Sequence, residues 1–340
     1  MTTAGPVAVG ADFPQRIARA AGDGVSVLAL EVMPGGHSGL THRAALSARA
    51  QWPDVVIKST PPGRAPRGRH DVLRQARVIE ALAGLAGVPV PQMCFTSSDE
   101  PPFFATALVP GEAVDPVIAE DDNSFAPAVV SARWDAAIEV LAQLHAVDPP
   151  GRGLLDGPPR TPAEELKIWC QTMSAAKMDD DPAYVRLRAA MLSDVPPLGR
   201  AAVVHGDFRL GNILFDGVEP RALIDWEIWS LGDPLVDLAW FVQFTDGDNF
   251  PGVGQRVAGT PSAAEVIERY VAATGDARPE MSWFIALGAL KLAAIQAHNR
   301  RRHLDGRFHD PYQAQLGPSI ARHLARGLDV VEYNSYNHYL

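Results

Sequence analysis

Three side chains that could carry chemistry lie close together in the sequence: Asp207, Asn212 and Asp225. The first two lie five residues apart in the segment HGDFRLGN, and Asp225 follows thirteen residues after Asn212, at the end of an apolar run. Phosphoryl transfer needs a group that accepts or orients the proton of the attacking hydroxyl, and oxygen ligands for a Mg²⁺ ion that bridges the phosphates. Asp207 suits the first role. Asn212 and Asp225 suit the second, because Mg²⁺ prefers carboxylate and amide oxygens.

Each of these residues has a simpler interpretation when it is taken alone, because an isolated aspartate in a loop more often forms a turn or caps a helix. Together, and in this order, they match what phosphoryl transfer requires, so we interpret them as one site. Two later acids, Asp233 and Asp237, are candidates for helix caps, and for Asp233 a role in capping or loop architecture is the preferred interpretation. His205 is expected to pack or hydrogen-bond beneath the loop rather than to transfer protons.

The pattern of the N-terminal third predicts a small α+β lobe. Residues 25–60 contain an apolar run, a glycine-rich turn at 34–39 and a second strand that ends in Lys58, as in antiparallel β-structure. Residues 72–85 place apolar side chains at helical spacing, and 88–109 return to extended apolar runs broken by prolines. We therefore expect strands, one helix and further strands to form a lobe over residues 1–110.

The remainder of the chain, residues 111–340, is predicted to be a mainly helical lobe. The boundary is placed near residue 110, where Pro110 and Gly111 precede a polar stretch and the composition shifts from β-type to helical. Residues 201–228 depart from this helical character, because short apolar runs there flank a loop. Such loops within a rigid lobe usually carry function.

Helix ends can be predicted at three places in the second lobe. Thr161 with Glu164, and Ser262 with Glu265, have the spacing of capping boxes. Gly275 suits the left-handed position that follows a helix. The core is expected to include the tryptophans at 226, 229 and 240.

The charge of the chain limits its partners. The 340 residues carry a formal net charge of −10 and have a pI near 5.4, whereas nucleic acid or an anionic membrane would require a positive surface field. The hydrophobic segment 283–295 is interrupted by Lys291 and is too short to span a bilayer. With no signal-peptide pattern at the N-terminus, we expect a cytoplasmic protein with neither nucleic acid nor membrane as a partner.

Several other functions are disfavoured by absent patterns. The two cysteines, Cys94 and Cys170, are far apart and form no CxxC or Cys/His cluster, so neither a disulfide framework nor a zinc site is indicated. The sequence contains no Walker P-loop, no dinucleotide-binding glycine fingerprint and no G-x-S-x-G nucleophile elbow.

The segments HGDFRLGN, IDWE and GDPLVDLA, spread over residues 205–239, resemble the aminoglycoside phosphotransferase and choline kinase superfamily. This superfamily is similar in fold to protein kinases, so the resemblance implies a two-lobed kinase-like fold that uses ATP and Mg²⁺. The run 264–270 and the helix after it are most similar to the kinase-like domain of acyl-CoA dehydrogenase family members and to free-standing bacterial phosphotransferases.

The resemblance also implies a role for individual residues. Asp207 would be the catalytic base, Asn212 and Asp225 would bind Mg²⁺, and Asp237 would brace the loop through backbone hydrogen bonds. Lys58 would hold the α- and β-phosphates. The backbone of the glycine-rich loop would cover those phosphates through Gly35, Gly36, His37, Ser38 and Gly39.

Three further positions follow from the same comparison. The hinge from Ala107 to Val109 would offer backbone groups to adenine. Arg209, two residues after the base, is proposed to lie near the γ-phosphate. The family usually has a glutamate where this chain has Gln75, so the expected ion pair with Lys58 would become a hydrogen bond to a neutral amide.

Three hypotheses remain open for the activity. The acceptor would be a small-molecule hydroxyl, with a hydroxyacyl-CoA or hydroxy acid favoured by the subgroup resemblance. An aminoglycoside or other amino alcohol is the alternative acceptor, for which an acidic pocket is needed. The third hypothesis is a nucleotide-binding pseudokinase scaffold, motivated only by Gln75.

Overall fold

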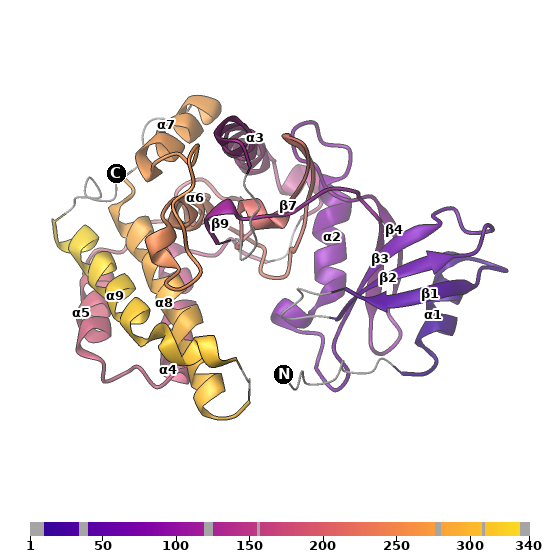
Figure 1. The fold of residues 1–340 in the computed structure, drawn as a ribbon, viewed down its shortest axis with the longest axis horizontal. Coiled ribbons are helices and arrows are strands. Elements are labelled where there is room, and N and C mark those ends of the chain that lie inside the picture. The colour runs from indigo at the N-terminus through magenta and orange to yellow at the C-terminus, as the bar shows by residue number, and fades with distance from the viewer. Residues whose placement is uncertain are drawn as a thin grey trace.

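The computed structural model describes residues 10–33, 40–118, 125–154, 157–275, 280–307 and 310–333. The N-terminal lobe is built on a five-stranded antiparallel sheet in the order β1-β2-β3-β5-β4 (Figure 1). Its strands are β1 (Val27–Val32), β2 (Leu40–Leu46), β3 (Asp54–Ser59), β4 (Met93–Ser97) and β5 (Phe103–Ala107).

Strand alternation decides which way Lys58 points. Val55 and Ile57 of β3 are fully buried on one face of the sheet, where they pack with Phe13 and Ile17 of helix α1 (Phe13–Ala21). Because successive side chains of a strand point to opposite faces, Lys58 lies on the other face. The sequence analysis did not anticipate α1, which completes the core of this lobe.

Helix α2 (Val72–Leu82) stands between the sheet and the C-terminal lobe, as Figure 1 shows. It begins at Asp71, whose side chain accepts a hydrogen bond from the Arg74 backbone N–H, and it contacts β4 and β5. Its buried face includes Val78, Ile79 and Leu82. The predicted amphipathic helix is therefore confirmed, and it places polar residues of the first lobe beside the second.

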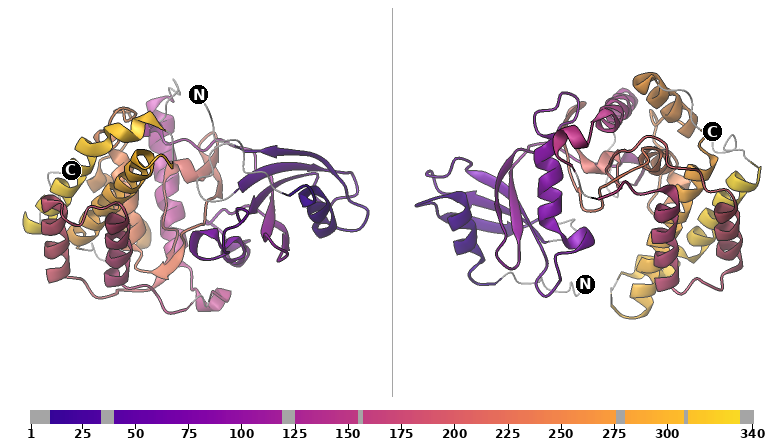
Figure 2. Two further views of the ribbon diagram at one scale, coloured as in Figure 1. Left: turned by 90° about the horizontal axis from the view of Figure 1, so that it is seen from below. Right: turned by 180° about the vertical axis from the view of Figure 1, so that it is seen from behind.

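The C-terminal lobe is mainly helical and packs around α8, which contacts α4, α6 and α9. Both views in Figure 2 show these helices on one side of the molecule and the sheet on the other. The helices are α3 (Pro127–Ala146), α4 (Pro162–Ala175), α5 (Pro182–Ser193), α6 (Leu235–Phe241), α7 (Ala263–Thr274), α8 (Ser282–Leu304) and α9 (Gly317–Tyr333). Short 3₁₀ turns occur at η1 (Gly68–His70), η2 (Pro116–Ile118), η3 (Pro150–Arg152), η4 (Leu210–Asn212), η5 (Val242–Thr245), η6 (Gly247–Asn249) and η7 (Pro311–Leu316).

The predicted helix ends are confirmed. Thr161 and Glu164 exchange both hydrogen bonds of a capping box, and so do Ser262 and Glu265. Gly275 ends α7 with φ of 70°, in the left-handed region. In the described ranges, no helix combines the length and apolar character that crossing a membrane requires.

Two short antiparallel pairs interrupt the helical lobe where the sequence predicted strands and loops. β6 (Ala202–Val204) pairs with β9 (Ser230–Gly232), and β7 (Ile213–Asp216) pairs with β8 (Glu219–Leu223). The loops that connect these strands carry Asp207, Asn212 and Asp225. The α+β class is thus confirmed. The strand pairs position the loops of the candidate site so that Asp225 reaches Lys58 of the sheet.

Candidate active site

The loop after β6 requires glycine at position 206. Gly206 has φ of 85°, and a Cβ atom there would lie 2.7 Å from the backbone oxygen of Ile228. Only glycine adopts this conformation without strain and leaves room for the neighbouring chain. The tight turn directs the next side chain, Asp207, toward the space between the lobes.

Asp237 braces this loop from below, as predicted. Its carboxylate accepts hydrogen bonds from the backbone N–H groups of His205, at 2.6 Å, and Gly206, at 2.8 Å. His145 lies 3.3 Å from the same carboxylate. His205 is also buried, and its Nε2 lies 2.9 Å from the Ile224 carbonyl oxygen. The expectation that His205 hydrogen-bonds beneath the loop is therefore confirmed.

The Asp207 carboxylate is held at both oxygens. Trp240 Nε1 donates to Oδ1 at 2.8 Å, and Asn212 Nδ2 donates to Oδ2 at 2.9 Å. Burial raises the pKa of Asp207, but the charges of Arg209 and Lys291 outweigh that effect and leave the pKa below its usual range. Asp207 is therefore an ionised, oriented carboxylate, as a group that accepts a proton from a hydroxyl must be.

The β7–β8 pairing brings Asn212 and Asp225 together. Ile213 pairs with Leu223, and one position further the Ile224 N–H donates to the Asn212 carbonyl oxygen at 2.9 Å. Asp225 therefore follows directly beside Asn212. Its backbone has φ of 66°, an unusual conformation for a residue other than glycine, and such strain is concentrated at functional sites.

Lys58 reaches the same place from the sheet. Its Nζ lies 2.6 Å from Asp225 Oδ1 and 3.8 Å from Glu227 Oε2. Burial and the adjacent Asp225 charge raise the pKa of Glu227 to about 7. Glu227 was missed by the sequence analysis, although an acid two residues after a candidate metal ligand was a usable signal.

The donor set fits a hard divalent cation. Asp225 and Glu227 provide carboxylate oxygens and Asn212 an amide oxygen, which are the ligand types that Mg²⁺ accepts. The two carboxylates already gather around one cation, the Lys58 ammonium. In the part of the chain that is described, no three His, Cys, Asp or Glu side chains form a self-sufficient metal cage. Mg²⁺ sites completed by phosphates and water have this incomplete protein shell.

Gln75 does not take the partner that was expected. Its Nε2 donates to the Arg69 carbonyl oxygen at 3.2 Å, and its side chain is buried. The expectation of a Lys58–Gln75 hydrogen bond is corrected, because two carboxylates attract the ammonium more strongly than a neutral amide does. A direct role of Gln75 in nucleotide binding stays a prediction.

Arg209 is engaged mainly by a buried acid that the sequence analysis did not select. Its guanidinium forms an ion pair with Asp115, whose other oxygen accepts the Gly211 N–H at 2.9 Å. Arg209 Nε also lies 3.5 Å from Asp207 Oδ2. The arginine therefore supports the loop, and its proposed approach to the γ-phosphate stays a prediction.

The remaining predicted nucleotide contacts are described only in part. Positions 35–39 of the glycine-rich loop lie outside the described residues. In the hinge, the Ala107 N–H donates to the Gln92 carbonyl oxygen at 2.9 Å and the Leu108 N–H to the Asp54 carbonyl oxygen at 3.2 Å. No described residue accepts the Val109 N–H. Within the predicted hinge, Val109 thus carries the backbone N–H that has no described acceptor, and its contact with adenine stays a prediction.

A pocket of 680 Å³ opens beside the catalytic loop, between α4, α2 and the loop after Asp225. Gly206, which immediately precedes Asp207, and Glu227, two residues after Asp225, line it. Five basic side chains also line it, against three acidic ones at Glu164, Glu165 and Glu227. The basic residues are Arg69, Arg74, Arg160, Lys167 and Lys291. A locally cationic pocket is notable in a chain with a net charge of −10.

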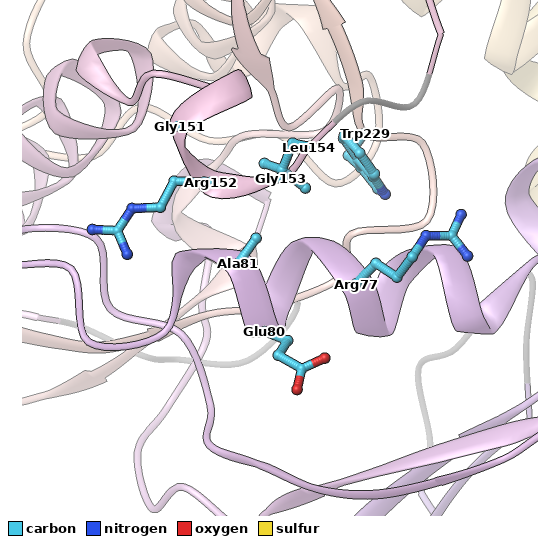
Figure 3. Close-up of a pocket in the computed structure, with 8 residues that line it drawn as sticks. All are labelled: Arg77, Glu80, Ala81, Gly151, Arg152, Gly153, Leu154 and Trp229. Carbon is cyan, nitrogen blue, oxygen red and sulfur yellow. The ribbon is translucent and has the colours of Figure 1, made fainter.

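A second pocket, of 640 Å³, lies between α2 and the turn at η3 (Figure 3). Figure 3 shows the guanidinium groups of Arg77 and Arg152 directed to opposite ends of this pocket. Glu80, Ala81, Leu154 and Trp229 also line it, together with the backbone of Gly151 and Gly153. Because no set of polar groups converges in it, we assign it no ligand.

A two-lobed fold with an oriented aspartate, an adjacent acid pair and a lysine from the sheet defines the class of kinase-like phosphotransferases. The comparison with known families agrees. Residues 30–284 match the phosphotransferase enzyme family, and the chain belongs to that family. The predicted family and the predicted kinase-like fold are thereby confirmed.

Proteins of two kinds are among the similar sequences. The chain is 31% identical over 300 residues to acyl-CoA dehydrogenase family member 11 of Gallus gallus, a match that covers 83% of this chain and 38% of the relative. The human protein of the same name is 31% identical over 268 residues and is covered to 34%. This chain therefore spans little more than a third of these relatives. Viomycin phosphotransferase of Streptomyces vinaceus is 31% identical over 183 residues, covering 51% of this chain and 60% of that protein.

Solved structures share the fold at low sequence identity. A candidate aminoglycoside phosphotransferase from Ralstonia eutropha superposes with a TM-score of 0.76 at 22% identity, covering 94% of this chain and 97% of the other. Aminoglycoside phosphotransferase APH(4)-Ia, solved with ADP and hygromycin B, gives a TM-score of 0.60 at 16% identity, with 95% and 99% covered.

Proposed function

We propose that this chain transfers the γ-phosphoryl group of ATP, bound with Mg²⁺, to a hydroxyl group of a small molecule. The observation that carries the proposal is the Asp207 carboxylate, fixed by Trp240 and Asn212 and kept ionised beside an acid pair that attracts a cation. A carboxylate so arranged supports the role of catalytic base.

The reaction forms a bond between the acceptor oxygen and the γ-phosphorus and breaks the bond from that phosphorus to the β-γ bridging oxygen. Asp207 accepts the hydroxyl proton, and ADP leaves. Mg²⁺, when bound, neutralises charge on the phosphates. Asn212 and Asp225 would hold it, with Glu227 close by. Most of the rate enhancement comes from positioning rather than from a covalent intermediate.

The nucleotide would be held mainly from the first lobe. Lys58 lies on the face of the sheet that meets the acid pair, so it is placed to exchange Asp225 for phosphate oxygens. The backbone of residues 35–39 is proposed to cover the phosphates, and the Val109 N–H to meet adenine. Arg209 is proposed to lie near the γ-phosphate from the catalytic loop, and Gln75 to act from α2, where it holds the Arg69 carbonyl oxygen.

For the acceptor, we propose an anionic molecule, specifically a hydroxyacyl-CoA or a related hydroxy acid. The basic pocket supports this, because Arg69 and Lys167 would attract phosphate or carboxylate groups to the side of Gly206 and Asp207. The similarity to acyl-CoA dehydrogenase family members points the same way.

An amino-alcohol acceptor is the second candidate. It is favoured by the similarity to viomycin phosphotransferase. It would need free acids in the acceptor pocket, but Glu165 is paired with Arg160, Glu227 with Lys58, and Glu164 accepts the hydrogen bonds of its capping box from Thr161. The pseudokinase alternative was motivated by Gln75 as a weak partner of Lys58. It is less favoured here, because Asp225 and Glu227 position Lys58 without Gln75.

A coupled ADP-release screen tests the proposal. It would compare hydroxyacyl-CoAs, hydroxy acids, aminoglycosides and choline-like alcohols, each with ATP and Mg²⁺. We expect acceptor-dependent ADP release for a hydroxyacyl-CoA and its loss in Asp207→Asn. Turnover of aminoglycosides alone would overturn the anionic acceptor, and wild-type activity in Asp207→Asn would overturn the base.

Charge reversal in the pocket tests the acceptor more narrowly. Lys167 is exposed on α4 and lines the pocket, so Lys167→Glu should raise the KM for an anionic acceptor about tenfold while the KM for ATP stays unchanged. Arg19→Glu, an equal charge change on the outer helix α1, is the matched control. An unchanged acceptor KM in Lys167→Glu would remove the pocket from the proposal.

A further inference from the structure

Lys291 is a buried cation in the middle of an apolar helix. It lies on α8 among buried neighbours such as Leu290 and Leu292, and its own exposure is 3%. Burying an ammonium group is costly unless specific partners compensate for the lost water. A methionine or leucine would fill the same space without the desolvation cost of a buried charge, so the partners of Lys291 require an explanation.

The first partner is the catalytic loop. Lys291 Nζ donates a hydrogen bond to the carbonyl oxygen of Gly206, the residue immediately before Asp207. The N–H of Gly206 is bound by Asp237 Oδ1 at 2.8 Å. Both polar groups of the Gly206 backbone are thus hydrogen-bonded to buried side chains, and this fixes the direction in which the chain enters Asp207.

The second partner is Trp240. Lys291 Nζ lies 3.9 Å from the centroid of this indole ring, a distance at which a cation is attracted to the ring face. The edge of the same ring carries Nε1, which donates to Asp207 Oδ1 at 2.8 Å. One indole therefore connects the ammonium on its face with the carboxylate at its edge.

Within the described ranges, no carboxylate comes within ion-pair distance of Lys291 Nζ. The ammonium is compensated by the Gly206 carbonyl, by the Trp240 ring and, at 5.2 Å, by the Trp169 ring. Two of these three contacts lead directly to Asp207. A lysine present only to fill the core would have no reason to concentrate its contacts there.

We propose that Lys291 is a positioning residue that fixes the orientation of Asp207 through the Gly206 carbonyl and the Trp240 indole. The inference rests on the proposed role of Asp207 as the base. Lys291 also lines the acceptor pocket, but in this role it acts through Gly206 and Trp240 rather than by contact with the substrates. Its loss should therefore lower kcat and leave the KM for ATP unchanged.

The test uses the full chain and the best acceptor from the ADP-release screen. Lys291→Met is expected to lower kcat about 10²-fold, the cost of misplacing a reacting group by about 1 Å, with the KM for ATP within about twofold. Gln296→Met is the matched control: it is a buried polar residue of the same helix, but its amide lies near Asn249 and His323. Its kcat should match the wild type.

A rescue experiment separates positioning from packing. Lys291→Ala would leave a space at the wall of the 680 Å³ pocket, into which n-propylammonium or the similarly sized n-propanol could diffuse. Restoration of kcat by n-propylammonium but not by n-propanol supports the proposal. Equal restoration by both, or an unchanged kcat in Lys291→Met, overturns it.

The outcome remains interpretable if one variant fails to fold. Lys291→Arg keeps a cationic donor, so it should retain kcat within about tenfold, and a loss as large as that of a folded Lys291→Ala would contradict the proposal. Asp207→Asn, assayed in parallel, tests the underlying function. If Asp207→Asn is inactive while Lys291→Met is fully active, only the inference about Lys291 fails.

Discussion

The ammonium of Lys58 lies 2.6 Å from the carboxylate of Asp225, although 167 positions separate the two residues in the sequence. This contact joins the sheet of one lobe to the loop after β8 in the other. It shows that the cleft between the lobes concentrates negative charge at one point. Under the proposed function, Lys58 exchanges this partner for phosphate oxygens when the nucleotide binds. The ion pair with Asp225 is then the arrangement of the site without nucleotide.

Replacing Asp225 should separate nucleotide chemistry from folding. Asp225→Asn removes a carboxylate from the proposed metal site, and turnover should fall at least about 10²-fold. Calorimetry should show that Mg²⁺ no longer strengthens ATP binding, while circular dichroism stays that of the wild type. Asp216→Asn, at an exposed position on β7, is the control and should change neither. A variant at 225 with wild-type Mg²⁺ dependence would contradict the assignment.

Asp237 should matter for stability. Its buried carboxylate accepts two backbone N–H groups and faces His145, whereas an asparagine would turn its own N–H₂ toward one of these donors. Asp237→Asn should therefore lower the free energy of unfolding by about 2–4 kcal/mol, measured by urea denaturation. The surface variant Asp135→Asn should change it by less than about 1 kcal/mol. Equal effects of the two would show that the brace contributes little.

Much of the site could be predicted because its residues are close in sequence. The spacing of Asp207 and Asn212 identifies a tight loop, and the β7–β8 hairpin then brings Asp225 beside them. The capping box at Thr161 and the stop at Gly275 depend only on neighbouring residues as well. Short-range geometry is encoded locally, and for this reason these predictions are confirmed.

The contacts that were missed depend on packing between distant segments. The partner of Lys58 is decided by where Asp225 and Glu227 lie after folding. The sequence does not show that these acids approach Lys58, so it predicted a bond with Gln75 instead. Trp240 was predicted as core, and it is buried, but its Nε1 bond to Asp207 depends on the docking of α6 against the loop. Lys291 was noticed only as an interruption of an apolar run. Its partner, Gly206, lies 85 positions away.

A methyl group at position 206 should disturb catalysis more than nucleotide binding. In Gly206→Ala the new Cβ would lie 2.7 Å from the Ile228 oxygen, so the loop must shift and Asp207 with it. We expect kcat to fall about 10²-fold and the KM for ATP to stay within about twofold. Gly217→Ala is a matched control, because Gly217 has φ of 62° but an added Cβ would meet nothing within 4 Å. Its cost should be about 1–2 kcal/mol of stability with normal turnover, and an equally inactive Gly217→Ala would contradict the steric explanation.

His323 should make the stability of the C-terminal lobe depend on pH. Its ring, on the buried face of α9, lies beside Asn249 and Ser319, and burial lowers its pKa to about 4. An unfolded chain would have an ordinary histidine pKa near 6.5. Between these two values the unfolded state binds the additional proton, so stability is present above pH 6.5 and is lost as the pH falls toward 4.

The size and origin of this effect can both be measured. A difference of about 2.5 pH units corresponds to at most about 3 kcal/mol of unfolding free energy, to be followed by urea denaturation at a series of pH values. Other buried histidines contribute to the wild-type slope, so the informative quantity is the difference from His323→Gln, whose side chain does not titrate. The variant should lose stability less steeply below pH 6.5 than the wild type. Parallel curves for wild type and His323→Gln would mean that the buried ring is not the group that resists protonation.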